Sequence, residues 1–180
     1  MAATFAWKEK NGAGLSLPGQ TITTIGWKNT DNYDETTPGQ RYIDNPVTAG
    51  NNSYTKIIYG HFSGSFNEIS AGLFAHTAGT LTNIVLKGPV TMSASGDAFA
   101  NTTPSTTALS PSSTMTGVTA IGGGVTVWFS GTTPDSTTTK ASSSTANPTY
   151  TNFLTTQMQV GASAIAGDHP ITLTLQYNES

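Results

Sequence analysis

Residues 54–66, YTKIIYGHFSGSF, form the long central strand candidate of this sequence. Successive side chains of a β-strand point to opposite faces, so Ile58 and Phe62 fall on one face while Ile57 and Tyr59 fall on the other. Both faces are therefore partly apolar. This pattern predicts a strand with one face in the core of a two-layer protein and the other face partly covered by a loop or a neighbouring strand.

Two polar side chains lie within the same segment. We predict that Lys56 and His61 lie at the solvated rims of the strand, with the aliphatic stem of the lysine over apolar surface. Under this interpretation neither side chain has to titrate for a reaction.

Strand patterns recur along the chain, whereas helical patterns are almost absent. Residues 171–177 alternate between apolar and polar side chains, which is typical of a strand with one buried face. Asn11-Gly12 is a hairpin signal because both residues tolerate positive φ, and a change of phase between Ile22 and Ile25 indicates a bulge. The predicted strands are residues 4–10, 21–27, 54–66, 70–75, 82–87, 125–130, 153–160 and 171–177.

The number and spacing of these segments predict an all-β protein. We expect a single-domain antiparallel β-sandwich over residues 1–180, with an immunoglobulin-like or jelly-roll-like arrangement. Three polar segments, about residues 29–46, 93–116 and 131–149, are predicted to be long loops. Loops of this length are usually functional, or become ordered when they meet a partner. The chain has no cysteine, which excludes disulfides and thiolate metal ligands.

Charged residues make up only 9% of the chain, against about 25% in an average globular protein. The formal net charge is -3, and no basic run is present that would follow a phosphate backbone. We therefore expect no nucleic-acid partner. No segment approaches the ~20 apolar residues that span a bilayer, and the first ten residues lack a signal-peptide pattern, so we expect no membrane partner.

The sequence contains no convincing catalytic set. Its histidines are His61, His76 and His169, and a Ser-His-Asp triad would have to use the adjacent pair Asp168-His169. Neighbouring residues in an extended turn point in different directions, so Asp168 is poorly placed to orient that imidazole. No Gly-x-Ser-x-Gly motif is present. We therefore expect no enzymatic activity, and we interpret residues 166–170 as a turn that leads into the last strand.

The acidic residues that cluster in the sequence are Asp31, Asp34, Glu35 and Asp44. Several carboxylate oxygens on one turn can bind Ca²⁺, so a calcium site is one interpretation. Their spacing matches no EF-hand loop, and a solvated acidic loop is the simpler interpretation. We expect no cofactor.

Aromatic residues fall into two groups. Trp7, Trp27 and Trp128 lie within apolar strand segments and are predicted to pack in the core, although exposed tryptophans would stack on sugars. Tyr33 and Tyr42 lie in polar loop sequence instead. Because tyrosine is enriched at protein interfaces, these two are the candidate interface residues.

Residues 46–79, PVTAGNNSYTKIIYGHFSGSFNEISAGLFAHTAG, resemble a segment of small virion structural proteins from tailed bacteriophages and prophages. The shared features are a TAGxNSYxK stretch, an aromatic strand and a small-residue F-x-G-x-F step. Residues 4–12, 127–131 and 171–180 are similar to further parts of the same proteins. The likeness covers most of the chain and carries over no functional residue.

The resemblance implies a capsid decoration (cement) protein, made in the host cytoplasm and placed on the capsid exterior. Its implied partners are the major capsid protein or other virion proteins, and we expect a symmetric trimer or dimer because closed homo-oligomers are common. The three long loops are the hypothetical contact segments. The alternatives are a tail-tube, baseplate or fibre component, and a carbohydrate-binding adhesin module that uses Tyr33 and Tyr42.

Overall fold

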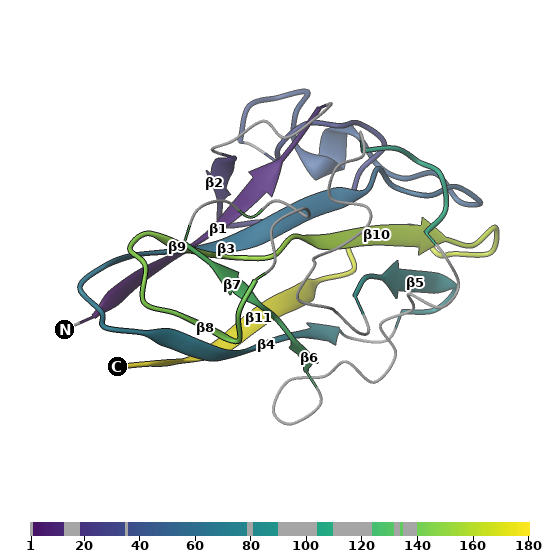
Figure 1. The fold of residues 1–180 in the computed structure, drawn as a ribbon. Helices are drawn as coiled ribbons and strands as arrows, with labels where there is room; N and C mark the ends of the chain where they lie inside the picture. The colour runs from purple at the N-terminus through teal and green to yellow at the C-terminus, as the bar shows by residue number, and fades with distance from the viewer. Residues whose placement is uncertain are drawn as a thin grey trace.

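The computed structural model describes residues 2–12, 19–34, 36–78, 81–89, 104–109, 124–131, 134 and 140–180. Two antiparallel sheets pack against each other, which confirms the predicted all-β sandwich (Figure 1). The described residues form no α-helix, and none of them belongs to a helix long and apolar enough to cross a membrane.

The first sheet has seven strands, with β3 at its centre. β10 pairs with the first half of β3, β9 pairs with the second half, and β7 pairs with β9. The strands of this sheet are β2 (Gln20–Ile22), β1 (Ala3–Lys10), β3 (Lys56–Gly64), β10 (Leu154–Val160), β5 (Ile84–Lys87), β9 (Thr149–Thr151) and β7 (Phe129–Ser130).

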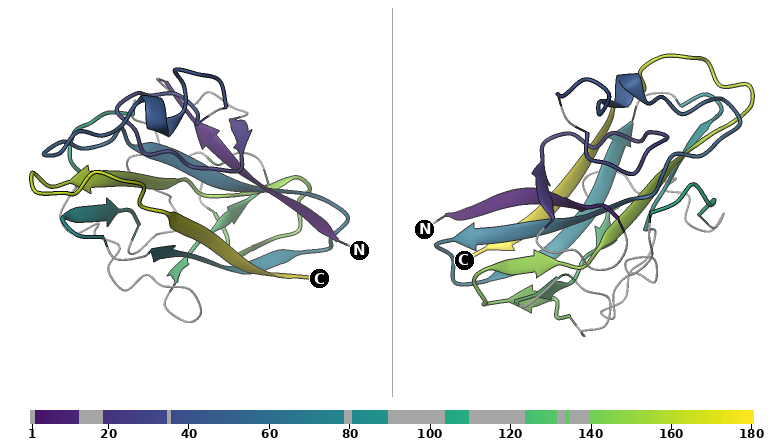
Figure 2. Two further views of the ribbon diagram at one scale, coloured as in Figure 1. Left: turned by 180° about the vertical axis from the view of Figure 1, so that it is seen from behind. Right: turned by 90° about the horizontal axis from the view of Figure 1, so that it is seen from above.

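The second sheet has four strands, and its last strand brings the C-terminus to the same end of the sandwich as the N-terminus (Figures 1 and 2). The backbone amide of Ala3, at the start of β1 in the first sheet, donates to Oε1 of Glu179 in the second sheet at 2.8 Å, so a hydrogen bond joins the two sheets near the chain ends. The strands of the second sheet are β11 (Ile171–Glu179), β4 (Ile69–Ala78), β6 (Val125–Thr126) and β8 (Ser143–Ser144).

The predicted strand 125–130 is divided between the two sheets. β6 pairs with β4 in the second sheet, whereas β7 pairs with β9 in the first. Between them the amide of Val127 donates to the carbonyl of Gly72 at 2.9 Å. The chain therefore turns a corner of the sandwich within six residues, and the prediction of one continuous strand was wrong.

The hairpin indicated at Asn11-Gly12 is present, since β1 and β2 pair in antiparallel orientation, but its connection is not a tight turn. Gly12 has φ +74°, as the signal requires, but the register Glu9↔Gln20 leaves a longer connection between β1 and β2. The Asn11 amide and the Gly12 backbone N–H both donate to the carboxylate of Asp31, each at 2.9 Å. These residues anchor a distant loop instead of closing a tight turn. β2 ends at Ile22, so the strand predicted to Trp27 is shorter than expected.

The segment 131–149 is not a loop throughout. It contains β8 and the first residue of β9, and Ala141 exchanges two backbone hydrogen bonds with Phe129, at 2.8 and 3.0 Å. Lys140 is buried. This segment therefore contributes to both sheets, although its Thr/Ser-rich composition predicted a loop.

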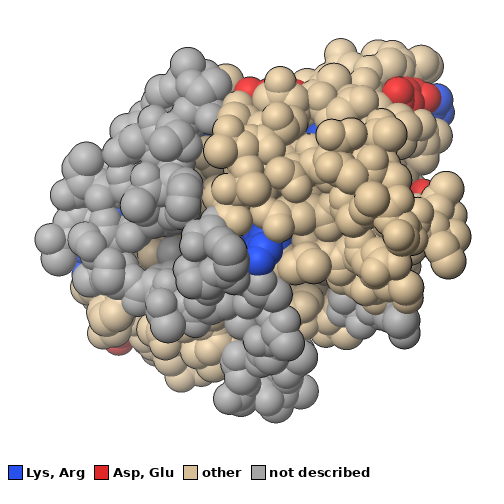
Figure 3. All heavy atoms as spheres, turned by 90° about the vertical axis from the view of Figure 1, so that its right-hand side faces the viewer, with Lys and Arg blue, Asp and Glu red and all other residues tan. Residues whose placement is uncertain are grey.

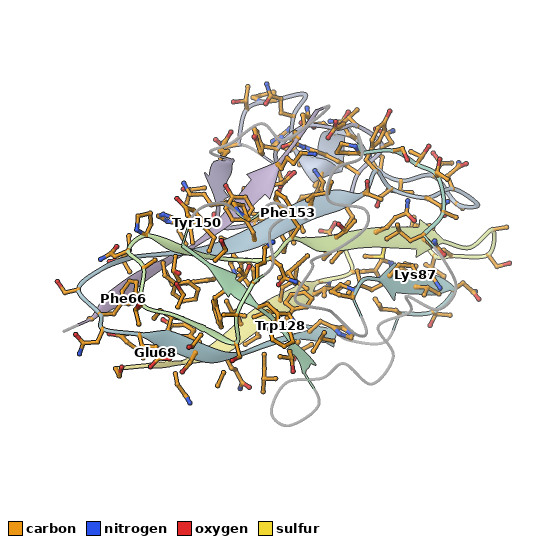
Figure 4. The ribbon with its side chains drawn as sticks, in the orientation of Figure 1. Phe66, Glu68, Lys87, Trp128, Tyr150 and Phe153 are labelled. Carbon is orange, nitrogen blue, oxygen red and sulfur yellow. The ribbon has the colours of Figure 1, made fainter. Side chains whose placement is uncertain are left out.

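Both faces of β3 are covered, as its sequence predicted. Ile58 and Phe62 belong to the main core between the sheets. Ile57 and Tyr59 form a smaller cluster with Phe153 on the opposite face, and Tyr150 and Phe153 lie beside this strand in Figure 4. Trp7 and Trp27 pack against the main core and are partly buried, whereas Trp128 is half-buried outside both clusters.

A β-bulge in β4 brings two segments of the core into close contact. Ala71 and Gly72 together lie opposite Tyr177, and Ala71 has φ +52°. A Cβ atom on Gly72 would lie 2.4 Å from Cγ2 of Val127 and 2.6 Å from Cζ of Phe129. Gly72 is therefore required by the close approach of the corner segment.

Replacement of Gly72 by alanine should destabilise the fold by about 1–3 kcal/mol, because a methyl group has to displace packed core side chains. Chemical denaturation measures the free energy of unfolding. Ala71→Gly is the matched control, because Ala71 has a positive φ that glycine adopts without steric strain. This substitution should leave stability unchanged or raise it by up to about 1 kcal/mol. A Gly72→Ala protein as stable as the wild type would contradict the close packing.

Candidate functional site

The candidate interaction surface is loop 29–46, at the end of the sandwich away from the termini (Figure 1). It contains the 3₁₀ turn η1 (Tyr42–Asp44), and its ends are joined by a backbone hydrogen bond from Asn29 to Asn45 at 3.1 Å. Viewed from this end, most of the described surface is neither acidic nor basic (Figure 3). The loop is described except for Glu35.

Lys28 anchors this loop from inside the protein. Its side chain is fully buried, and Nζ donates to the carbonyls of Tyr33, at 2.6 Å, and Gln40. A buried ammonium group must be hydrogen-bonded, because its transfer from water is otherwise very unfavourable. The loop therefore wraps around this cation.

Lys56 and Glu9 form a second buried anchor. Nζ of Lys56 lies 2.9 Å from Oε1 of Glu9, and the two side chains are 1% and 0% exposed. Nζ also donates to the carbonyl of Asn32 at 2.8 Å, which ties the loop to β1 and β3. The prediction that Lys56 lies at a solvated rim was wrong, since it shares the inner face of β3 with Ile58 and the loop covers it.

Burial raises the pKa of Glu9, and the attraction of Lys56 opposes that rise. Asn11 donates to Oε1 of Glu9 at 3.0 Å, but the other oxygen, Oε2, is buried and makes no hydrogen bond to the described residues. This carboxylate therefore depends mainly on Lys56 for its stabilisation.

The acidic residues of the loop stabilise its backbone. Oδ1 of Asp34 accepts from the amide of Tyr42 at 2.7 Å. Asp44 accepts two hydrogen bonds from Arg41 and one from the amide of Gly39, each at 2.8 Å, and the hydrogen bond from Arg41 is the main reason why the pKa of Asp44 is lowered. In the described part of the chain, no group of three or more His, Cys, Asp or Glu side chains is placed to hold a metal ion.

The two predicted interface tyrosines differ in exposure. Tyr42 is 39% exposed, and its neighbour Ile43 is 52% exposed, so η1 presents an apolar pair to solvent. Tyr33 is half-buried, and its backbone carbonyl accepts from Lys28. Burial raises the pKa of Tyr59, and the Tyr33 phenol lies near enough to add to that rise. Tyr42 therefore lies on the surface, whereas Tyr33 supports the loop.

Sequence reasoning missed Ile43 and Ile165. Ile165 is 71% exposed in the connection between β10 and β11. Both are isolated large apolar residues within polar or small-residue segments, and that contrast is the signal that would have found them.

Part of the predicted loop 93–116 lies against the first sheet. Only residues 104–109 of it are described, and Gln157 of β10 holds them. The buried amide of Gln157 donates to the carbonyls of Ser53 and Thr107 at 3.0 Å, while its oxygen accepts from the amide of Leu109 at 2.9 Å. Residues 104–109 are therefore bound by the protein itself.

In the described part of the chain, no hydrogen bond or ion pair joins Asp168 to His169, the pair that the Ser-His-Asp triad considered from the sequence would need. The ring of His61 lies 5.0 Å from that of Tyr150, and burial lowers its pKa. Nε2 of His169 lies 3.3 Å from the carbonyl of Ile165, and Asp168 is exposed. Asp168 and His169 lie in the irregular segment before β11.

Comparisons of the chain with models of protein families, with curated proteins and with solved structures found no match. The site is therefore interpreted from its own geometry.

Replacement of Lys28 by methionine should loosen loop 29–46, because two backbone carbonyls lose a buried charged donor. We expect faster amide hydrogen exchange in residues 29–45 and a stability loss of about 1–3 kcal/mol. Lys8→Met is the matched control, since Lys8 donates to the Thr21 hydroxyl at the surface. Equal exchange rates in the two variants would contradict the anchoring role of Lys28.

A double-mutant cycle tests the buried ion pair. Lys56→Met should cost about 3–5 kcal/mol because it leaves Glu9 buried without its partner. Adding Glu9→Gln should then cost little or restore stability, since the unpaired charge is removed. If the losses of unfolding free energy in the two single variants sum to the loss in the double variant, the two groups are not coupled.

Proposed function

We propose that this chain is a non-enzymatic structural protein of a tailed-phage virion, a decoration protein that binds the outer surface of the capsid. The resemblance to virion proteins includes residues 46–79, which contain β3 and β4. These strands form the centre of the two sheets, so the likeness lies in the framework of the fold.

The observation that carries the proposal is the apolar pair Tyr42 and Ile43 on a tightly tethered loop. Lys28 and Lys56 hold this loop from inside, and Asp34 and Asp44 hold its backbone. A contact surface that is ordered before binding loses less conformational entropy when its partner arrives. An exposed tyrosine beside an isoleucine is also the type of residue pair that forms the centre of an interface.

The low charge of the chain also supports a role in which many copies lie close together on one particle. Many copies of a decoration protein lie near one another on one particle, and a net charge of -3 keeps their mutual repulsion small. Weak contacts that are repeated by symmetry then act together. The partner in this proposal is the major capsid protein.

Loop 29–46 is the main contact segment in this proposal. The described parts of segments 93–116 and 131–149 bind their own sheets, which leaves them less surface for a partner. Removing residues 131–149 would therefore damage the fold, so point substitutions are the appropriate test.

The experiment mixes the purified protein with expanded heads, free of this protein, from the phage that encodes it. Co-sedimentation should show saturable binding, and electron microscopy should show density on the outer surface at a symmetry-matched copy number. The double substitution Tyr42→Ala, Ile43→Ser should reduce occupancy about tenfold or more, as expected for a central interface pair. Val85→Ser is the matched control, because Val85 is also exposed but lies on β5.

Absence of binding to heads would contradict the proposal. Density located in the tail would favour the tail-component alternative. Binding to a glycan array that is lost on Tyr42→Ala would favour the adhesin alternative.

A further inference from the structure

The second sheet ends in a long edge strand. β11 has nine residues and pairs with β4 along one side, and no strand of the described residues pairs with its other side. The other described strands that pair with one strand only are much shorter, with four residues in β5, three in β2 and two in each of β6, β7 and β8. Figure 2 shows β11 at the margin of its sheet.

This edge lacks the features that normally prevent strand pairing. Proteins protect a free edge with charged side chains, prolines or very short strands. β11 has no charged residue and no proline from Ile171 to Asn178, and the flanking Pro170 and Glu179 lie at its two ends. Alternate residues of an edge strand direct their backbone N–H and C=O groups outward, so this edge offers a row of donors and acceptors that none of the described strands pairs.

The same flank of the sandwich is incompletely closed. The inward side chains of β11 pack against the main core but are only partly buried, and so are the nearest side chains of the first sheet. Phe5 and Tyr177 meet across this flank with ring centroids 6.2 Å apart. The partly buried residues here are Phe5, Trp7, Ile22, Ile171, Leu173, Leu175 and Tyr177. An additional strand beside β11 would cover them.

The order of residues in β11 suits a second copy of this chain. A twofold axis at Thr174 would pair β11 with itself in antiparallel orientation, as isologous contacts require. Leu173 would then lie opposite Leu175, and Ile171 opposite Tyr177. On the outer face Thr172 would lie opposite Gln176. Apolar residues thus meet apolar residues, polar residues meet polar residues, and no like charges face each other.

We propose that the protein forms a twofold dimer in which β11 of one copy pairs with β11 of the other, centred on Thr174. The two four-stranded sheets then become one continuous sheet across the interface. The proposal rests on the edge and its flank and is independent of the virion role, because loop 29–46 takes no part in it.

The absence of cysteine allows a direct test. Thr174→Cys places its only thiol opposite its own copy, and the 4.5–5.5 Å between Cα atoms of an antiparallel pair fits the span of a disulfide. Mild oxidation should give a cross-linked dimer on a non-reducing gel. Thr126→Cys is the matched control, because Thr126 is exposed on the outer face of the same sheet but lies on β6. It should remain monomeric on the gel.

A charge test checks the same register in solution. Sedimentation equilibrium should show a wild-type dimer, and Thr174→Lys or Thr174→Glu should each weaken it about tenfold or more, because like charges meet at the axis. Mixing these two variants should restore a heterodimer, and Thr126→Lys should leave the dimer unchanged. Circular dichroism and thermal unfolding verify that each variant is folded.

Three results would overturn the proposal. They are a wild-type chain that is monomeric or trimeric, a Thr174→Cys protein that cross-links no faster than Thr126→Cys, and Thr174→Lys and Thr174→Glu proteins that do not recover a dimer when mixed. Each is independent of head binding, so a failure here is distinguishable from a failure of the proposed function.

Discussion

Two buried lysine ammonium groups determine the organisation of one end of this sandwich. Lys28 is solvated by carbonyls of loop 29–46, and Lys56 joins the same loop to Glu9 on β1. A charge removed from water must be paired or hydrogen-bonded, so these cations order a segment that has almost no apolar residues of its own. Tyr42 and Ile43 are exposed on this loop, whose backbone carbonyls are held from inside by the two lysines.

The central strand β3 connects this end to the rest of the fold. Its inner face contributes Ile58 and Phe62 to the core and Lys56 to the ion pair, while its outer face packs with Phe153. The fold thus combines an ordinary apolar core with a polar interior at one end. Five of the seven basic residues are buried: Lys10, Lys28, Lys56, Lys87 and Lys140. On the face seen in Figure 3, most of the described surface carries neither acidic nor basic side chains.

The two candidate surfaces differ in their physical character. Loop 29–46 presents side chains on a tethered backbone, so its contact with a partner would depend on shape and apolar area. The edge of β11 presents backbone groups, so its contact would depend on strand geometry and self-complementarity. A dimer through β11 would carry two such loops, and paired loops would increase the avidity for a repetitive surface such as a capsid.

The amino-acid sequence is enough to predict the all-β class, the central strand with two covered faces and the clean alternation of β11, because side-chain periodicity is a local property that burial of one face imposes directly. It also located Tyr42 in a loop. Three further features become visible only in the folded chain: residues 125–130 divide between two sheets, residues 131–149 supply β8, and Asn11-Gly12 binds Asp31. The pairing of Lys56 with Glu9 is also visible only in the folded chain. Each of these features depends on hydrogen bonds and charges that join residues far apart in the chain, and no spacing in the sequence records which distant group a side chain will meet.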